Sequence, residues 1–213
     1  LLGGDGVIVW AANRMASLLV LRGVANEDDR EVYAFGFECL LATVVQALFL
    51  LTAGLLLNVL VPLLCFSLAF TALKQNIGGW HAESHGTCLV STTIMSVVAV
   101  LVGRALPVWS AAPFLGAAWV LVVRYAPIPH ENNPKTAAES ARAKQASLRV
   151  LAAGTAVCCA LVLLSFPWAA CAIHGATGLC LAALTLIPAK RRCKDAKEQG
   201  TANGGKSRNE VGP

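Results

Sequence analysis

Long runs of hydrophobic residues alternate with short polar gaps over most of the chain. The first run, Val7 to Leu21, carries Asn13, Arg14 and Ser17 clustered on one side, which predicts an amphipathic helix lying on a membrane surface. A first, tilted membrane span is the alternative interpretation of the same run. Gly23 follows shortly afterwards and is typical of a helix end.

About six further segments are candidates to cross the roughly 30 Å hydrocarbon core, since each helical residue rises about 1.5 Å, although two of them are short of the usual ~17–25 residues. They are Phe35 to Leu57, Val59 to Leu73, Cys88 to Val102, Leu106 to Val123, Leu148 to Phe166 and Trp168 to Ile187. Asn58 marks a tight turn between the first two. The second and third segments are short, so we expect helices that stop partway and leave the polar gap between them lining a cavity.

The composition indicates that the solvent is a lipid bilayer. Hydrophobic residues make up 56% and charged residues 14% of the chain, whereas a water-soluble domain has about 25% charged residues. The predicted fold class is therefore all-α, a polytopic membrane protein with about six transmembrane helices plus the N-terminal amphipathic helix. We expect residues 1–190 to form a single integral membrane domain and residues 191–213 to be a basic, disordered tail.

Positive charge is distributed unevenly along the chain. The net charge of +5 concentrates in the segments Arg124 to Arg149 and Lys190 to Lys197. With a cytoplasmic N-terminus, both segments and the polar gap after residue 77 would lie on the cytoplasmic side, as the positive-inside rule requires. We therefore expect both termini and this gap in the cytoplasm. The same charges are interpreted as contacts with anionic membrane lipid and not as a nucleic-acid surface.

One polar gap, Gly78 to Cys88, combines the residue types of a nucleophilic site in the run GGWHAESHGTC. Most other cysteines lie inside apolar runs, whereas Cys88 follows two histidines, and a thiol with an imidazole is the minimum machinery for acyl transfer. His81 is seven residues before Cys88 (88 − 81 = 7), which is roughly 10 Å along a straight helix and beyond hydrogen-bonding reach. Pairing these two side chains requires a bent backbone, which the glycines of the gap allow.

His85 is the competing base, because it lies three residues before Cys88, a spacing that brings side chains together on a helix. Spacing alone does not decide between the two histidines. His81, His85 and Cys88 also resemble a set of metal ligands, which would suit a membrane metal-binding or transport protein. A structural zinc site requires a fourth ligand, however. A structural loop without chemistry is the remaining interpretation.

The order of several motifs resembles the accessory gene regulator B (AgrB) family of bacterial membrane endopeptidases. An acidic, tyrosine-containing signature stands at Ala25 to Leu41. A basic residue, a glycine pair, His-Ala and a downstream cysteine follow from Lys74 to Cys88, and a Tyr-Ala-Pro element extends from Arg124 to Thr136. The resemblance covers about Val7 to Ile187, and the Gly-Gly-x-His-Ala core with its downstream cysteine is the most specific part.

The resemblance implies a multi-pass cysteine endopeptidase of the bacterial cell membrane whose active site faces the cytoplasm. Such an enzyme cuts the C-terminal part from a small AgrD-like propeptide and keeps the remaining peptide as a thioester. It then promotes closure of a thiolactone or lactone ring, which yields the precursor of a quorum-sensing signal. The expected partners are this propeptide and membrane lipid, with a homodimer left open. No cofactor, metal or nucleic acid is expected.

Motif position makes Cys88 the nucleophile and His81 the base in this resemblance. The expected substrate-binding or supporting residues are Lys74, Gly78, Gly79, Glu83, His85 and Lys135. Lys74 stands where the family usually has arginine, and Lys lacks the bidentate fork of that residue. Lys135, with Arg142 and Lys144, is expected to hold an acidic part of the propeptide. Alternatively, these basic residues serve only to set the orientation of the chain in the membrane.

Overall fold

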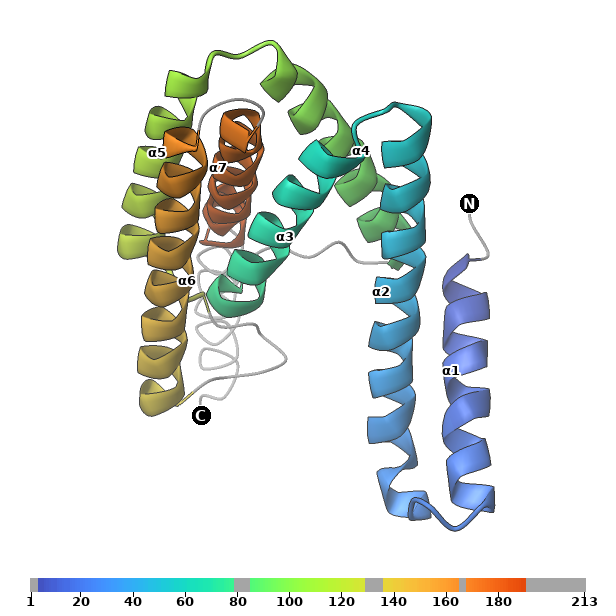
Figure 1. Ribbon diagram of the computed structural model, residues 1–213. Helices are drawn as coiled ribbons and strands as arrows, with labels where there is room; N and C mark the ends of the chain where they lie inside the picture. The colour runs from blue at the N-terminus through green and yellow to red at the C-terminus, as the bar shows by residue number, and fades with distance from the viewer. Residues whose placement is uncertain (1–3, 79–84, 129–135, 165–167, 191–213) are drawn as a thin grey trace, which may run out of the picture. The chain divides into compact units, whose positions relative to one another are not determined.

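The computed structural model describes residues 4–78, 85–128, 136–164 and 168–190, and these residues are helical with no β-strand among them (Figure 1). The α-helices are α1 (Gly4–Leu21), α2 (Arg30–Leu56), α3 (Leu60–Ile77), α4 (His85–Arg104), α5 (Ala111–Tyr125), α6 (Ala137–Leu163) and α7 (Trp168–Leu184). Two 3-10 turns, η1 (Glu27–Asp29) and η2 (Val108–Ser110), precede α2 and α5. The all-α prediction is therefore confirmed.

Six helical segments are long and apolar enough to cross a membrane, which confirms the predicted polytopic architecture. They are Glu27–Leu56, Leu60–Ile77, Gly86–Arg104, Val108–Tyr125, Ala137–Leu163 and Trp168–Lys190. The shorter apolar helix at Gly6–Leu21 precedes them, as expected. The chain is thus a multi-pass membrane protein, and the cytoplasmic location of its termini stays a prediction.

The helices bordering the polar gap are longer than the sequence predicted. α3 continues to Ile77 and has 18 residues, and α4 begins at His85 and has 20 residues. Both helices are long enough to cross a membrane. The expectation that they stop partway through it is therefore wrong as far as their length is concerned. The apolar pattern ends at Lys74, but lysine and glutamine are good helix formers, so the helix continues into polar sequence.

α6 also begins before its apolar part. Thr136 and Glu139 form a capping box, in which the Glu139 backbone N–H donates to Thr136 Oγ1 at 3.3 Å and the Thr136 N–H donates to Glu139 Oε2 at 2.8 Å. These bonds satisfy two donors that a helix start leaves free. The polar segment before Leu148, which lies outside the span expected from the sequence, therefore forms the first turns of α6.

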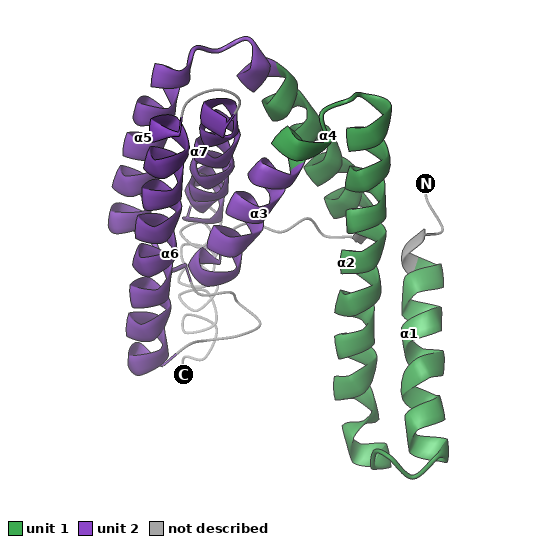
Figure 2. Ribbon diagram, viewed as in Figure 1, with its two compact units in different colours: residues 1–63, 81–101 green, residues 64–80, 102–213 purple. Residues whose placement is uncertain are grey.

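The chain divides into two compact units, residues 1–63 with 81–101 and residues 64–80 with 102–213 (Figure 2). We call them unit 1 and unit 2 and describe each by itself. The expected single domain over residues 1–190 stays a prediction, and the tail from residue 191 lies outside the described residues.

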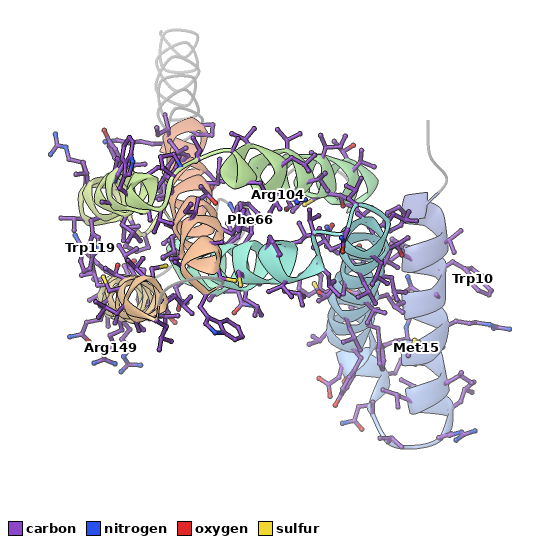
Figure 3. The ribbon with its side chains drawn as sticks, turned by 45° about the horizontal axis from the view of Figure 1, so that its top comes forward. Trp10, Met15, Phe66, Arg104, Trp119 and Arg149 are labelled. Carbon is purple, nitrogen blue, oxygen red and sulfur yellow. The ribbon has the colours of Figure 1, made fainter. Side chains whose placement is uncertain are left out.

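In unit 1, α1 packs antiparallel along α2 (Figure 1). Ala12 and Ala16 of α1 are fully buried, whereas Trp10 points away from the pair and is 65% exposed (Figure 3). Small residues at the contact let the two backbones approach closely. The turn predicted at Asn58 is present, since this residue adopts a φ of +53° and the Val59 N–H donates to Gly54 O at 2.9 Å.

In unit 2, α7 is the central helix and packs against α5 and α6. Most of its residues are buried, and many of them are alanine or glycine. Gly178 lies so close to α3 that a Cβ there would be 2.5 Å from the Phe66 carbonyl oxygen. Trp119 of α5 also donates its indole N–H to Thr155 Oγ1 of α6 at 3.1 Å. Close backbone packing and a few polar bonds hold this unit together.

Gly178→Ala should destabilise the protein, because its methyl group would overlap a backbone oxygen that cannot rotate away. Overpacking of this kind costs about 1–3 kcal/mol. Gly116→Ala in α5 is the matched control, since no atom lies within 4 Å of a Cβ there, and alanine favours a helix by about 0.5–1 kcal/mol over glycine. Thermal unfolding in detergent should show a lower Tm for Gly178→Ala alone; equal Tm values would contradict this packing.

Candidate functional site

The structure describes part of the candidate site. His81, Gly79 and Glu83 fall within residues 79–84, and Lys135 falls within residues 129–135, so these four lie outside the described residues. Lys74, Gly78 and Cys88 are described, and His85 is described in its backbone only. Cys88 belongs to unit 1, whereas Lys74 and Gly78 belong to unit 2.

Cys88 lies at the N-terminal end of α4, where its side chain is half-buried. Its Sγ atom lies 4.0 Å from Thr92 Oγ1, one turn further along the helix, and either atom could be the donor. Ser91 Oγ donates to the Cys88 carbonyl at 3.1 Å. The start of a helix carries backbone N–H groups without helical partners and favours negative charge. A nucleophilic sulfur and a developing oxyanion would both benefit from this location.

The backbone of α4 bears on the choice between the two histidines. Because the helix begins at His85, residues 85 and 88 are one turn apart on the same face. This is the condition under which spacing favours His85 as the base. Gly86 is helical, so it supplies no bend between the gap and Cys88. A bend that brings His81 to the sulfur has to come from residues before His85.

A polar stripe continues from Cys88 along α4. Thr92 and Ser96 follow at intervals of four residues, which places all three on neighbouring parts of one helix face. Ser96 is only 1% exposed and donates its hydroxyl to the Thr92 carbonyl at 2.7 Å. Thr92 is a neighbour of the sulfur that was not expected from the sequence, although its four-residue spacing from Cys88 on a helix indicates the contact.

Lys74 is held in place by a neighbouring helix of unit 2. It lies in the last turn of α3, and its Nζ donates to Thr185 Oγ1 at 2.8 Å. Thr185 follows α7 directly and donates its own hydroxyl to Ala182 O at 2.7 Å. The ammonium group is therefore a positioned charge at the end of α3. Sequence reasoning could not find this contact, because its partners are 111 residues apart.

Gly78 ends α3 in a conformation that suits glycine. Its φ is +69°, and the Ile128 N–H donates to the Ile77 carbonyl at 3.2 Å, forming an isolated bridge between Gly78 and Ile128. A Cβ at Gly78 would lie 2.6 Å from the Ile128 oxygen. The bridge ties the start of the polar gap to the segment after α5, and the bend expected between His81 and Cys88 stays a prediction.

The basic residues after α5 are partly engaged with the protein itself. Lys144 of α6 donates from Nζ to the Val123 carbonyl at 3.3 Å, near the end of α5 where helical carbonyls lack partners. Lys190 places its Nζ 4.5 Å from the centre of the Tyr125 ring, a cation–π contact. These contacts join helix ends within unit 2, so a structural role for the cations accompanies any role in binding substrate.

Gly78→Ala should lower stability more than Gly23→Ala. Both positions have a φ near +70°, so each alanine incurs the same backbone strain of about 1–2 kcal/mol. At Gly23 nothing lies within 4 Å of a Cβ, whereas at Gly78 the methyl group would displace Ile128. Thermal unfolding should therefore give the larger Tm decrease for Gly78→Ala. A decrease no larger than that of Gly23→Ala would show that the bridge to Ile128 is dispensable.

Comparison with known proteins agrees with this arrangement of motifs and helices. The family described as accessory gene regulator B matches residues 12–186. AgrB-like protein 2 of Clostridium perfringens is 25% identical over 150 residues, which cover 63% of this chain and 70% of that protein. No solved structure shows a significant match. The family match covers most of the chain and shows that it belongs to the accessory gene regulator B (AgrB) family, quorum-sensing accessory proteins associated with peptide processing.

Proposed function

We propose that this chain is a membrane-embedded cysteine endopeptidase that cleaves the C-terminal part from a small AgrD-like propeptide. The observation that carries the proposal is the position of Cys88 at the N-terminal end of α4, directly after the histidine-containing gap of an AgrB-family chain. A half-buried sulfur at the start of a helix has the access and the electrostatic surroundings that an acyl-transfer nucleophile needs.

The first step is attack of the Cys88 sulfur on the carbonyl carbon of the scissile peptide bond. His81 takes the thiol proton and later gives it to the leaving amine. A carbon–sulfur bond forms, the carbon–nitrogen bond breaks, and the C-terminal peptide departs with a free amino group. The N-terminal part of the propeptide remains on Cys88 as a thioester.

The second step closes the ring. An internal thiol or hydroxyl of the bound peptide attacks the thioester carbonyl, and the imidazole moves the proton from this nucleophile to the departing Cys88 sulfur. Exchange between two thiols is nearly isoenergetic, because one thioester replaces another. Exclusion of water by the membrane-embedded helices favours this exchange over hydrolysis.

Positive charge at the end of α3 contributes to substrate binding in this proposal. Lys74 is fixed by Thr185, so its ammonium group needs little reordering to meet a carboxylate of the propeptide. Arg142 and Lys144 occupy the early, polar turns of α6, and Lys135 shortly precedes them. An acidic C-terminal part of a propeptide would complement this charge. The reaction and the site face the cytoplasm in the proposed topology.

Cys88→Ala and His81→Ala should each lower propeptide cleavage by roughly a thousandfold or more, because each removes a group that the first step requires. His85→Ala should keep substantial activity. The assay is mass spectrometry of a synthetic propeptide incubated with the purified chain in lipid vesicles. Cys39→Ala is the matched control, since Cys39 is an exposed thiol of unit 1 on another helix.

Three results would contradict specific parts of the proposal. Full activity of Cys88→Ala would exclude the thioester route. Complete loss in His85→Ala, with His81→Ala active, would move the base to the helical histidine. Stoichiometric zinc in the purified protein, whose removal by a chelator abolishes function, would favour the metal-binding alternative with His81, His85 and Cys88 as ligands.

A further inference from the structure

α2 contains two long polar side chains within its apolar stretch, Glu38 and Gln46. Two hydroxyls of the same helix bond to their own backbone: Thr43 Oγ1 donates to Cys39 O and Thr52 Oγ1 donates to Leu48 O, each at 2.8 Å. Gln46 instead donates from Nε2 to Thr93 Oγ1 of α4 at 3.0 Å, within unit 1. An amide in an apolar segment costs free energy unless it has a hydrogen-bond partner. The bond to Thr93 therefore stabilises the contact between α2 and α4 at this point.

The acceptor is itself oriented by the helix that carries the candidate nucleophile. Thr93 donates its hydroxyl to the Leu89 carbonyl at 2.7 Å. The hydroxyl hydrogen is thereby engaged, and the oxygen is left to accept from Gln46. The bond therefore connects the α2 amide to the backbone of α4 through an oriented hydroxyl, and it opposes rotation of α4 at this point.

Thr93 is five residues beyond Cys88 (93 − 88 = 5), about 7.5 Å along the helix axis. Its immediate neighbour Thr92 is the residue whose hydroxyl contacts the sulfur. Because successive helical residues are rotated by about 100°, holding Thr93 against α2 sets the direction of the stripe formed by Cys88, Thr92 and Ser96. A rotation of α4 by one residue position would turn the sulfur away from its present direction.

We propose that Gln46 is a positioning residue, which acts through Thr93 to aim the Cys88 sulfur at the substrate carbonyl. This inference rests on the proposed endopeptidase function. Gln46 touches neither the sulfur nor the substrate; it restricts the rotation of α4. A loss of this restriction lowers the fraction of bound substrate that reaches the attacking geometry, so it affects kcat and leaves binding largely unchanged.

The test measures kcat and KM of propeptide cleavage for Gln46→Leu, Thr93→Val and the double variant in lipid vesicles. Each single variant should lower kcat about tenfold, equivalent to about 1.4 kcal/mol, with KM within about twofold of the unmodified chain. The double variant should be no worse than either single variant, because both remove the same bond. Thr93→Ser keeps the hydroxyl, so its kcat should equal that of the unmodified chain.

Thr43→Val is the matched control, because it removes a hydroxyl of α2 that bonds only to its own helix. It should leave kcat unchanged. An independent readout is disulfide trapping of Gln46→Cys with Thr93→Cys, in a chain whose Cys39 is replaced by alanine. The expected product is a crosslink between α2 and α4 that forms without any catalytic turnover.

The outcomes separate the inference from the function on which it rests. Normal kcat in Gln46→Leu, while Cys88→Ala is inactive, would overturn the positioning role and leave the endopeptidase intact. Additive losses in the double variant, or absence of the crosslink, would also overturn it. An active Cys88→Ala would instead remove the proposed function itself, whatever the behaviour of Gln46.

Discussion

The cost of leaving polar groups unpaired inside an apolar solvent governs much of this structure. The helices satisfy their own backbone groups, as hydrocarbon requires. Most polar side chains follow the same rule: Asn13 and Asn76, for example, donate to the carbonyl four residues earlier in their own helix, at 2.8 and 2.9 Å. The few side chains that bond elsewhere connect helices, and they determine how each unit is held.

Some of those connections hold the segments that border the polar gap, and others, such as the bond from Trp119 to Thr155, join helices elsewhere. In unit 2, Lys74 bonds to Thr185, and the bridge between Gly78 and Ile128 fixes the point where α3 ends. In unit 1, the bond from Gln46 to Thr93 holds the helix that carries Cys88. Each unit thus fixes one border of the gap by polar contacts, while the remaining packing relies on small residues. The proposed chemistry requires accurate placement of the groups that border the gap.

The sequence predicted the helical architecture well and the polar contacts between helices poorly. Hydrophobic run length identified all six spans and the turn at Asn58, because hydrocarbon leaves few alternatives to a helix. Run length placed some helix ends wrongly. Lys74 continues α3 and Thr136 caps the start of α6, although neither residue is apolar. The motif order gave the family. The contacts of Lys74 and Gln46 could not be predicted, because the partners are 111 and 47 residues away and only the folded chain brings them together. The roles of His81 and Cys88 stay predictions.

In the proposed mechanism, everything after the first step depends on a Cys88 sulfur that carries the propeptide as a thioester. Its most direct test is mass spectrometry of the intact chain after brief mixing with a propeptide whose internal nucleophile is replaced by alanine, so that ring closure cannot occur. We expect an adduct with the mass of the N-terminal peptide on Cys88, released by neutral hydroxylamine. Cleavage of this propeptide without any adduct on Cys88, or an adduct on another residue, would contradict it.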